Sequence, residues 1–262
     1  MKKILIIVLL GFVLLGGAGL LISSRKGKAA PKSSHLKEAE TAFSKKDYLK
    51  ARSLYEKTME ESQDIDQLKQ IQKKIEESNI KIIFSPLIEE CSTKYIVNPK
   101  DVLIKIAGKF NTTVGLIMRA NNLTSDIIKP RQELKVNTCE FSVVVDRSQN
   151  LLFLKRAGKI IKTYIVSTGK ENSTPIGNFK IANKIEHPTW FKTGAVIPPD
   201  SPENILGSRW MGFDIRGYGI HGTTKPNDLG RQVTLGCVRM RNEDVEELFD
   251  LIPKGAEVTI ID

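Results

Sequence analysis

The hydrophobic period of this sequence changes along its length, and the change divides the chain into segments of different kinds. Between residues 35 and 80, apolar side chains recur every three to four positions, the spacing of an amphipathic helix. Between 141 and 262 they form short runs separated by turn residues, the pattern of β-strands, with one helical stretch from Asn242 to Ile252. A chain of 262 residues that keeps the two patterns apart is expected to be an α+β protein of several domains.

An uncharged apolar run opens the sequence. Ile4 to Ile22 is nineteen residues without a charge, which as a helix would span about 28 Å, close to the roughly 30 Å of a bilayer core. No clean cleavage site follows it, so we expect a transmembrane anchor over 1–25, with a cleaved signal segment as the alternative. Basic residues flank the run on both sides, so they do not fix its orientation. A linker is expected over 26–34.

The charge of the chain is unevenly distributed. The net charge is +10, and six Lys or Arg with no acid fall within residues 1–34. Most of the surplus therefore flanks the apolar run instead of forming the basic face that nucleic-acid binding requires. We expect no nucleic-acid partner, and a membrane and an anionic cell envelope as the surroundings.

Three helices are expected between residues 35 and 80. The first two are separated by the polar break 44–47, and the third runs from Ile65 to about Ser78–Asn79. The spacing of the first two resembles one tetratricopeptide unit, which cannot bury its own apolar face and needs the third helix or a partner. This segment is expected to be a helical spacer or a contact for an envelope protein.

The pattern then changes to strand, helix, helix, strand, with Asp101 expected to cap the first of these helices. The informative residues are Tyr95-x-Val97, Asp101-Val102-Leu103-x-x-Ile106-Ala107-x-x-Phe110, Asn121-Asn122-Leu123 and Ile128-x-Pro130-x-Gln132-x-Leu134. Residues 91–139 thus resemble a LysM domain, a small βααβ module that binds N-acetylglucosamine polymers. Lys100 and Arg131 stand where glycines are common in that family.

Two of the three cysteines flank this module. If its strands are antiparallel and Tyr95 faces Lys135, then Cys91 and Cys139 fall opposite each other and can form a disulfide. Such a bridge would stabilise the fold by roughly 4 kcal/mol in the chain-entropy model, and it implies an oxidising compartment outside the cytoplasmic membrane. The alternative is three reduced, unrelated cysteines.

The third cysteine has the surroundings of a nucleophile. Cys237 lies sixteen residues after His221, with turn-forming residues between them that can bring the two together. A histidine that accepts the thiol proton generates the reactive thiolate. Gly222 and Gly236 allow the backbone to approach a substrate closely, and amides near Gly236 can face an oxyanion. These are the parts of an acyl-transfer site, although a buried structural cysteine and histidine are the simpler interpretation.

Further motifs occur in order around this pair: Ser173-Thr174-Pro175-Ile176-Gly177-Asn178-Phe179, Asn204-Ile205-Leu206-Gly207, Gly217-Tyr218-Gly219-Ile220-His221-Gly222-Thr223 and Thr234-Leu235-Gly236-Cys237-Val238-Arg239-Met240. Residues 141–262 therefore resemble the YkuD-type catalytic domain of L,D-transpeptidases. One departure is that Leu235 stands where the family usually has histidine. The strand pattern predicts a mainly-β domain, a sandwich with the helix from Asn242 packed on it and the site in a groove beside that helix.

The resemblance implies a peptidoglycan L,D-transpeptidase, which joins donor and acceptor peptide stems in 3–3 cross-links through a thioester on Cys237. It implies His221 as the base, oriented by the carbonyl of Gly222 or Thr223, and amides of residues 235–237 around the oxyanion. Expected substrate-binding residues are Arg239, Tyr218, Thr234 and Trp190, with a pair between Arg239 and Glu243 as the alternative for the arginine.

Two other functions stay open on the same residues. An L,D-carboxypeptidase would use water as the acceptor, and a catalytically weak protein would bind the wall through the LysM module. No cofactor is expected, and no metal, because His187 and His221 lack a third ligand at suitable spacing. The catalytic part is expected outside the cytoplasmic membrane, in the periplasm or cell wall.

Overall fold

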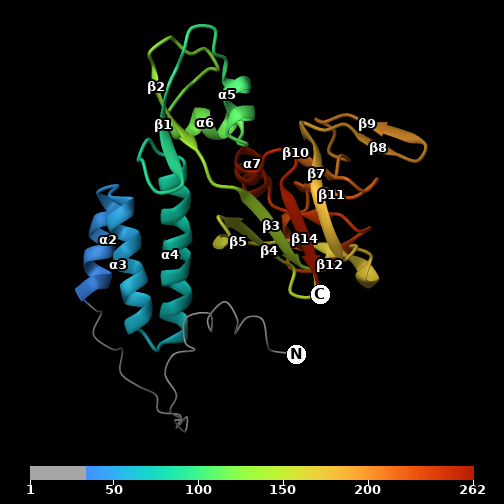
Figure 1. Ribbon diagram of the computed structural model, residues 1–262. Coiled ribbons are helices and arrows are strands. Elements are labelled where there is room, and N and C mark those ends of the chain that lie inside the picture. Colours follow the sequence, from blue (N-terminus) through green and yellow to red (C-terminus); the bar gives the residue numbers. More distant parts are fainter. Residues whose placement is uncertain (1–33) are drawn as a thin grey trace, which may run out of the picture. The chain divides into compact units, whose positions relative to one another are not determined.

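The structure, a computed structural model, describes residues 34–262 (Figure 1). The expected anchor at 1–25 and almost all of the linker 26–34 lie outside the described residues, so both stay predictions. Among the helices of 34–262, none is long and apolar enough to cross a membrane. The described chain combines helices with a β-rich C-terminal region, which confirms the α+β class.

Three helices, side by side in Figure 1, open the described chain: α2 (Ser34–Ser44), α3 (Tyr48–Glu61) and α4 (Ile65–Ile83). Asp64 begins α4 by accepting a hydrogen bond from Gln67 N at 2.8 Å, a standard N-cap. The α2–α3 hairpin buries its apolar face against α4, so the third helix supplies the cover that the pair needs. The shared core consists of Leu36, Ala39, Ala42, Ala51, Leu54, Tyr55, Ile71 and Ile75.

Helix α4 is longer than its sequence predicts. We expected it to end near Ser78–Asn79, and it runs to Ile83. Both polar side chains are satisfied within the fold: Ser78 Oγ donates to the carbonyl one turn earlier, and Asn79 Nδ2 donates to Ile161 O at 3.0 Å. The last turn also buries Ile80 and Ile83 in the main hydrophobic core. Tertiary packing therefore extends the helix past residues that usually end one.

The next module has the predicted order of elements, which are β1 (Ser92–Ile96), α5 (Leu103–Lys109), α6 (Val114–Ala120) and β2 (Glu133–Asn137). The two strands pair antiparallel, and the helices pack against them. The module has a hydrophobic core of its own, formed by Val97, Leu103, Ile106, Ala107, Ile117, Leu134 and Val136.

Cys91 and Cys139 form a disulfide with Cα atoms 5.1 Å apart. The strand register that led us to pair them is wrong by one residue, because Tyr95 faces Leu134 and not Lys135. Both cysteines lie just beyond the paired residues, where one further backbone hydrogen bond, from Thr138 N to Cys91 O at 2.9 Å, joins the two chain segments. The chain there brings the two sulfurs together without the two residues standing directly opposite.

The predicted helix cap at Asp101 is also wrong. Helix α5 begins at Leu103, and the Asp101 carboxylate accepts hydrogen bonds from Asn98 N and from the Tyr95 hydroxyl, both at 2.8 Å. The backbone and then the hydroxyl hydrogen bond lower the pKa of this carboxyl. Asp101 therefore closes the turn between β1 and α5, a common role for aspartate.

Two loops of the module keep a glycine-type backbone without glycine. Lys100 has a φ of 72° and Arg131 a φ of 69°, in the left-handed region that most side chains avoid. These are the two positions where the LysM pattern usually has glycine. The loops thus adopt at these positions a backbone conformation that glycine takes at little cost, although the residues are lysine and arginine.

The C-terminal region is built on one eight-stranded mixed sheet with the order β13-β11-β10-β7-β14-β3-β4-β5. Its strands are β3 (Phe141–Asp146), β4 (Leu151–Arg156), β5 (Lys159–Ile165), β7 (Gly177–Glu186), β10 (Arg209–Phe213), β11 (Gly219–His221), β13 (Val238–Arg239) and β14 (Glu257–Ile261). The two halves of the expected sandwich are thus joined edge to edge in one hydrogen-bonded order. The reason is the length of β7, whose first half pairs with β14 and whose second half pairs with β10.

Helix α7 (Asn242–Leu251) packs on this sheet through Val245, Leu248 and Leu251, all fully buried. Smaller elements connect the long strands. They are β6 (Thr168–Gly169), which pairs with β12 (Gln232–Thr234), the hairpin of β8 (Trp190–Lys192) and β9 (Ala195–Ile197), and the 3₁₀ turns η1 (Lys170–Asn172) and η2 (Pro226–Asp228).

Helix α4 covers the edge strand β5. Besides the bond from Asn79 to Ile161 O, the Thr163 hydroxyl donates to Glu76 Oε1 at 3.0 Å. Burial raises the pKa of the Glu76 carboxyl, and hydrogen bonds from Gln72 and Thr163 partly offset this. An exposed edge strand can pair with other chains, so a helix over it protects the sheet. The helical segment is therefore packed on the sheet through α4, and its role as a spacer stays a prediction.

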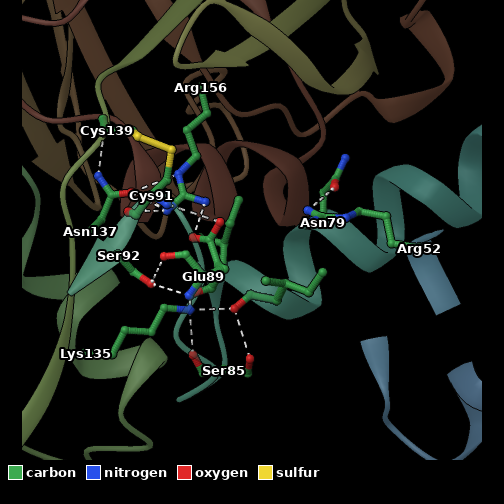
Figure 2. A network of polar contacts seen from close by, with 12 residues as sticks. Arg52, Asn79, Ser85, Glu89, Cys91, Ser92, Lys135, Asn137, Cys139 and Arg156 are labelled. Atoms are coloured by element: carbon green, nitrogen blue, oxygen red, sulfur yellow. Dashed lines mark hydrogen bonds and ion pairs between the residues drawn. A yellow bond between two sulfur atoms is a disulfide. The ribbon is translucent and has the colours of Figure 1, made fainter. Parts of the chain in front are cut away.

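A buried polar network, drawn in Figure 2, joins α4, the βααβ module and the sheet. Lys135 Nζ donates to Ile82 O and Ser85 O, at 2.7 and 2.8 Å, and so satisfies carbonyls at the end of α4. The Arg156 guanidinium, from β4, donates to Asn137 Oδ1 and Cys91 O. It also forms an ion pair of 2.8 Å with Glu89. Three segments thus share one set of buried contacts.

The lysine of this network should make stability depend on pH. Burial lowers the pKa of Lys135 from 10.5 to about 8. Between these values the unfolded chain binds the extra proton, so the contribution of Lys135 to the free energy of unfolding rises with pH. We expect the difference in this free energy between wild type and Lys135→Met to grow by about 2–3 kcal/mol from pH 7.5 to 10, measured by urea denaturation.

The matched control is Lys94→Met, because Lys94 faces Lys135 across the strand pair and is exposed. Its difference from wild type should stay nearly constant over the same pH range. A constant difference for Lys135→Met as well would show that Lys135 does not titrate as proposed.

Candidate active site

The predicted base, His221, ends strand β11, and the predicted nucleophile, Cys237, directly precedes the neighbouring edge strand β13. Strands β11 and β13 pair in parallel, with Ile220 facing Val238 and His221 facing Arg239. Residues in register point to the same face of a sheet, and Cys237 directly precedes β13. The Arg239 guanidinium acts electrostatically on both Cys237 and His221, which agrees with a common location of the three side chains.

The segment between the two residues is anchored at several points. It contains the turn η2 and the strand β12, which pairs with β6 and shifts register between Gln232 and Thr234. The predicted turn-formers therefore do bring the two ends of the segment to adjacent strands. The pairing of β12 with β6 fixes the course of the chain from His221 to Cys237.

The Cys237 thiol is partly buried, and its Sγ donates a long hydrogen bond to Gly217 O at 3.5 Å. Burial raises the pKa of the thiol to about 11, an effect that the backbone of Gly219 and the charge of Arg239 oppose only in part. At neutral pH the sulfur is therefore a thiol.

The His221 ring is buried, with 2% of the residue exposed, and it stacks on Trp210 at a centroid distance of 5.9 Å. Its Nδ1 lies 2.7 Å from Gly222 O, one of the two carbonyls predicted to orient the imidazole. A carbonyl only accepts, so Nδ1 carries the hydrogen and Nε2 keeps the lone pair of a base. Burial lowers the pKa of His221 to about 4, although the carbonyls of Gly222 and Leu206 act in the opposite direction.

The pair is therefore uncharged in the free protein over most of the pH range. A preformed thiolate–imidazolium pair would require the imidazole to be the stronger base of the two, and the two pKa values have the reverse order. Proton transfer from sulfur to nitrogen becomes favourable only when a bound substrate supplies compensating interactions.

Thr234 braces the loop that carries Cys237. Its hydroxyl accepts from Gly236 N at 3.1 Å and donates to Cys237 O at 2.7 Å, and the residue is buried. We expected Thr234 to bind substrate, and the structure instead gives its hydroxyl two partners in its own loop. The Gly236 amide, expected near the oxyanion, is held by the same hydroxyl.

Gly236 has no room for a side chain. Its φ is 130°, and a Cβ there would lie 2.6 Å from the ring of Tyr218 and 3.0 Å from Ser173 O. Tyr218, expected at the substrate, packs against this glycine and against the main core. The glycine therefore allows the loop to approach the tyrosine closely.

The other expected residues occupy different surroundings. Leu235 is 92% exposed, so its side chain points to solvent. Arg239 is nearly buried, with the Asp228 carboxylate 3.9 Å away, so its acidic neighbour is Asp228 and not Glu243. Its Nε is buried and has no hydrogen-bond partner within residues 34–262. Trp190 lies in the β8–β9 hairpin under the ammonium of Lys192, 5.5 Å from the ring centroid.

Two neighbours of this site are not among the site residues predicted from the sequence. Trp210, which stacks on His221, could have been found from the strand alternation that places it opposite His221 in β10. Asp228, the partner of Arg239, gave no signal beyond its place in a turn. Within the described residues, no group of three or more His, Cys, Asp or Glu is placed to hold a metal ion.

Comparison with protein families identifies both parts of this architecture. The model of the YkuD-type L,D-transpeptidase catalytic domain matches residues 140–260, and the LysM model matches residues 95–137. The chain is 41% identical over 126 residues to a putative L,D-transpeptidase, YqjB, of Bacillus subtilis, which covers 46% of this chain and 70% of that protein. It is 30% identical over 174 residues to the putative L,D-transpeptidase YkuD of Bacillus licheniformis, covering 63% and 97%.

Among solved structures, an L,D-transpeptidase from Mycobacterium tuberculosis aligns with a TM-score of 0.42 and 16% identity, over 51% of this chain and 63% of that one. The family matches and the two Bacillus relatives establish the assignment. The chain belongs to the L,D-transpeptidase family, and it carries a LysM domain before the YkuD-type catalytic domain.

The electrostatics of the site predict how Cys237 reacts. Because its thiol pKa is about 11 and Arg239 lowers that value, Arg239→Gln should leave less thiolate and slow alkylation of Cys237 by iodoacetamide. At pH 8 we expect a rate at least severalfold below wild type, measured by intact mass. Cys91 and Cys139 are joined, so they do not compete for the reagent.

Arg241→Gln is the matched control, since it removes an exposed arginine two residues further on. It should react at the wild-type rate. An Arg239→Gln variant that folds and reacts as fast as wild type would contradict the proposed electrostatic link.

Proposed function

We propose that this protein is a peptidoglycan L,D-transpeptidase that forms 3–3 cross-links through a thioester on Cys237. The observation that supports this most directly is the pairing of β11 with β13 in a chain of this family, because it brings His221 beside the segment that carries Cys237. A buried imidazole with one nitrogen bonded to a carbonyl, next to a cysteine, is the arrangement that nucleophilic catalysis uses.

In the first half-reaction, Cys237 Sγ attacks the carbonyl carbon of the third residue of a tetrapeptide stem. The thiol proton passes to His221 Nε2, and a C–S bond forms. The C–N bond to the terminal D-alanine then breaks, and the imidazolium returns the proton to the leaving amine. Because both groups start uncharged, proton transfer accompanies the attack instead of preceding it.

In the second half-reaction, the side-chain amine of a diamino acid in an acceptor stem attacks the thioester. His221 accepts a proton from this amine, the new amide bond forms, and the sulfur leaves and regains the proton. Both halves pass through an oxyanion. The Gly236 amide is held by Thr234, so we assign the oxyanion to the amides of Leu235 and Cys237. Each such hydrogen-bond donor stabilises the transition state by about 3 kcal/mol.

Arg239 is the proposed contact for a carboxylate of the donor stem. The guanidinium is nearly buried beside the reactive pair, its Nε lacks a partner in the described chain, and its distance to Asp228 is long for an ion pair. A planar guanidinium in such surroundings can bind a carboxylate strongly.

The LysM domain is proposed to hold the glycan strand, so that the catalytic domain acts on wall peptides. The Cys91–Cys139 disulfide supports a location outside the cytoplasmic membrane, in the periplasm or cell wall. Anchoring by Ile4–Ile22 and a contact between α2–α4 and an envelope protein rest on the sequence alone.

Purified tetrapeptide stems test the reaction. Incubation with wild type should give a 3–3 linked dimer and free D-alanine, and a carbapenem should add one mass adduct, as is general for this family. Cys237→Ala should give neither product nor adduct, because the attacking atom is gone. Mass spectrometry of protein and products measures both.

Two outcomes would favour the other functions. Free tripeptide without dimer would identify a carboxypeptidase that uses water as the acceptor. Lack of both product and adduct on a folded protein would leave wall binding through LysM, a result that the high thiol pKa and the replacement of histidine by Leu235 would then explain.

The pH dependence of kcat/KM should be unusually broad. His221 must be uncharged to act as a base, and its pKa of about 4 keeps it so at mildly acid pH. We expect kcat/KM to fall only below about pH 5, whereas a base of ordinary histidine pKa would lose activity below about 6.5. A profile with its acid limb near 6.5 would contradict the burial argument for His221.

A further inference from the structure

The side chain of Asn242, which lies outside the sequence motifs, holds the backbone segment that contacts His221. Asn242 is the first residue of α7, and its Oδ1 accepts hydrogen bonds from Thr223 N at 3.0 Å and Ser208 N at 3.3 Å. Thr223 follows β11 and Ser208 precedes β10. One amide oxygen therefore joins the loop that follows β11 to the loop that leads into the neighbouring strand β10.

Both loops are shaped to admit this oxygen. A Cβ on Gly207 or on Gly222 would lie 2.2 Å from Asn242 Oδ1, a distance that real atoms do not reach. The two glycines come from different parts of the sequence and leave room for the same atom. Because both hydrogen-bonding partners are backbone N–H groups, the acceptor facing them is the oxygen of the amide and not its nitrogen.

The bond to Thr223 N has a direct consequence for the histidine. The N–H of Thr223 and the carbonyl of Gly222 belong to one planar peptide group. Asn242 Oδ1 holds the N–H of this group, and its carbonyl lies 2.7 Å from His221 Nδ1. A rotation of the peptide that broke one of these contacts would break the other.

The second loop acts on the same ring. The backbone carbonyl of Leu206 also faces the imidazole, and Leu206 lies two residues before Ser208, whose N–H Asn242 holds. Both carbonyls that face His221 therefore lie on loops fixed by one side chain.

We propose that Asn242 is a positioning residue that fixes the tautomer and orientation of His221 through the Gly222–Thr223 peptide group. It has the place that an aspartate has in other triads, with a peptide group between it and the imidazole. The expected effect of Asn242 on turnover rests on the proposed function. Its expected effect on the tautomer of His221 does not depend on that function.

The test compares Asn242→Ala, Asn242→Asp and the control Glu243→Ala, which alters the exposed next residue of the same helical turn. Nitrogen NMR of the imidazole rings reports the tautomer of each histidine, and His221→Gln assigns the signal among the three histidines. Wild type and Glu243→Ala should show a single Nδ1–H tautomer. Asn242→Ala should show a mixture, and kcat should fall roughly 10- to 100-fold with little change in KM, as for other residues that orient a functional histidine.

The Asn242→Asp variant distinguishes a positioning role of Asn242 from a nonspecific loss of structure. Its carboxylate still accepts both N–H bonds, so the tautomer should be kept, and its negative charge should move the acid limb of kcat/KM to higher pH. The charged group that already acts on His221 is Arg239, from β13, and Trp210 of β10, which stacks on the ring, is neutral.

The proposal is overturned if Asn242→Ala keeps the single tautomer and the wild-type kcat, or if Asn242→Asp loses the tautomer as Asn242→Ala does. Thermal unfolding of each variant shows whether it is folded. If Asn242→Ala is misfolded, the tautomer and pH profile of Asn242→Asp decide whether the proposal holds. If the tautomers behave as expected while wild type has no turnover on stems, the positioning role stands and the proposed reaction fails.

Discussion

The parallel pairing of β11 with β13 is the contact on which the active site depends. It sets His221 beside Arg239 and thereby joins two segments that are sixteen residues apart in the sequence. Neither strand is long enough to be stable alone, since β11 has three residues and β13 has two. Their position comes from the packing around them, where Ile220 and Val238 are fully buried and α7 lies against the same core. The chemistry thus depends on the core of the whole domain.

Burial determines the charge state of this site and of the network that joins the domains. Around His221 and Cys237 it favours the neutral forms, because a charge that leaves water is costly unless partners replace the hydration. Lys135 shows the same effect, since even three carbonyl partners leave its pKa at about 8. Lys184 repeats the arrangement at the end of α7, where it donates to Phe249 O and Ile252 O and also has a pKa of about 8. A buried lysine and a half-buried one therefore complete two helix ends.

The sequence was sufficient for element types and for the family, and insufficient for contacts that depend on geometry. The order strand, helix, helix, strand within 91–139 and the helix from Asn242 follow from local hydrophobic patterns, and the structure has both. The register of β1 and β2 was missed by one residue, because a pair of cysteines constrains two Cα positions without fixing the ladder. Thr234 was assigned to the substrate from its place in a motif, and only the folded loop shows that both of its hydrogen bonds are internal. A side chain such as Asn242 is invisible to motif analysis, because its partners are backbone atoms of two distant loops.

The same reasoning explains how leucine can replace the usual histidine at position 235. The Leu235 side chain is 92% exposed, whereas the neighbouring Gly236 is confined by Tyr218 and has a φ that favours glycine. The geometry of the loop is therefore set at 234 and 236, by a bracing hydroxyl and by the absence of a side chain. A residue between two such fixed positions keeps its backbone conformation whatever its side chain is. Position 235 thus tolerates a change of side chain as long as its neighbours hold the backbone, and the amide is the part of Leu235 that the proposed chemistry uses.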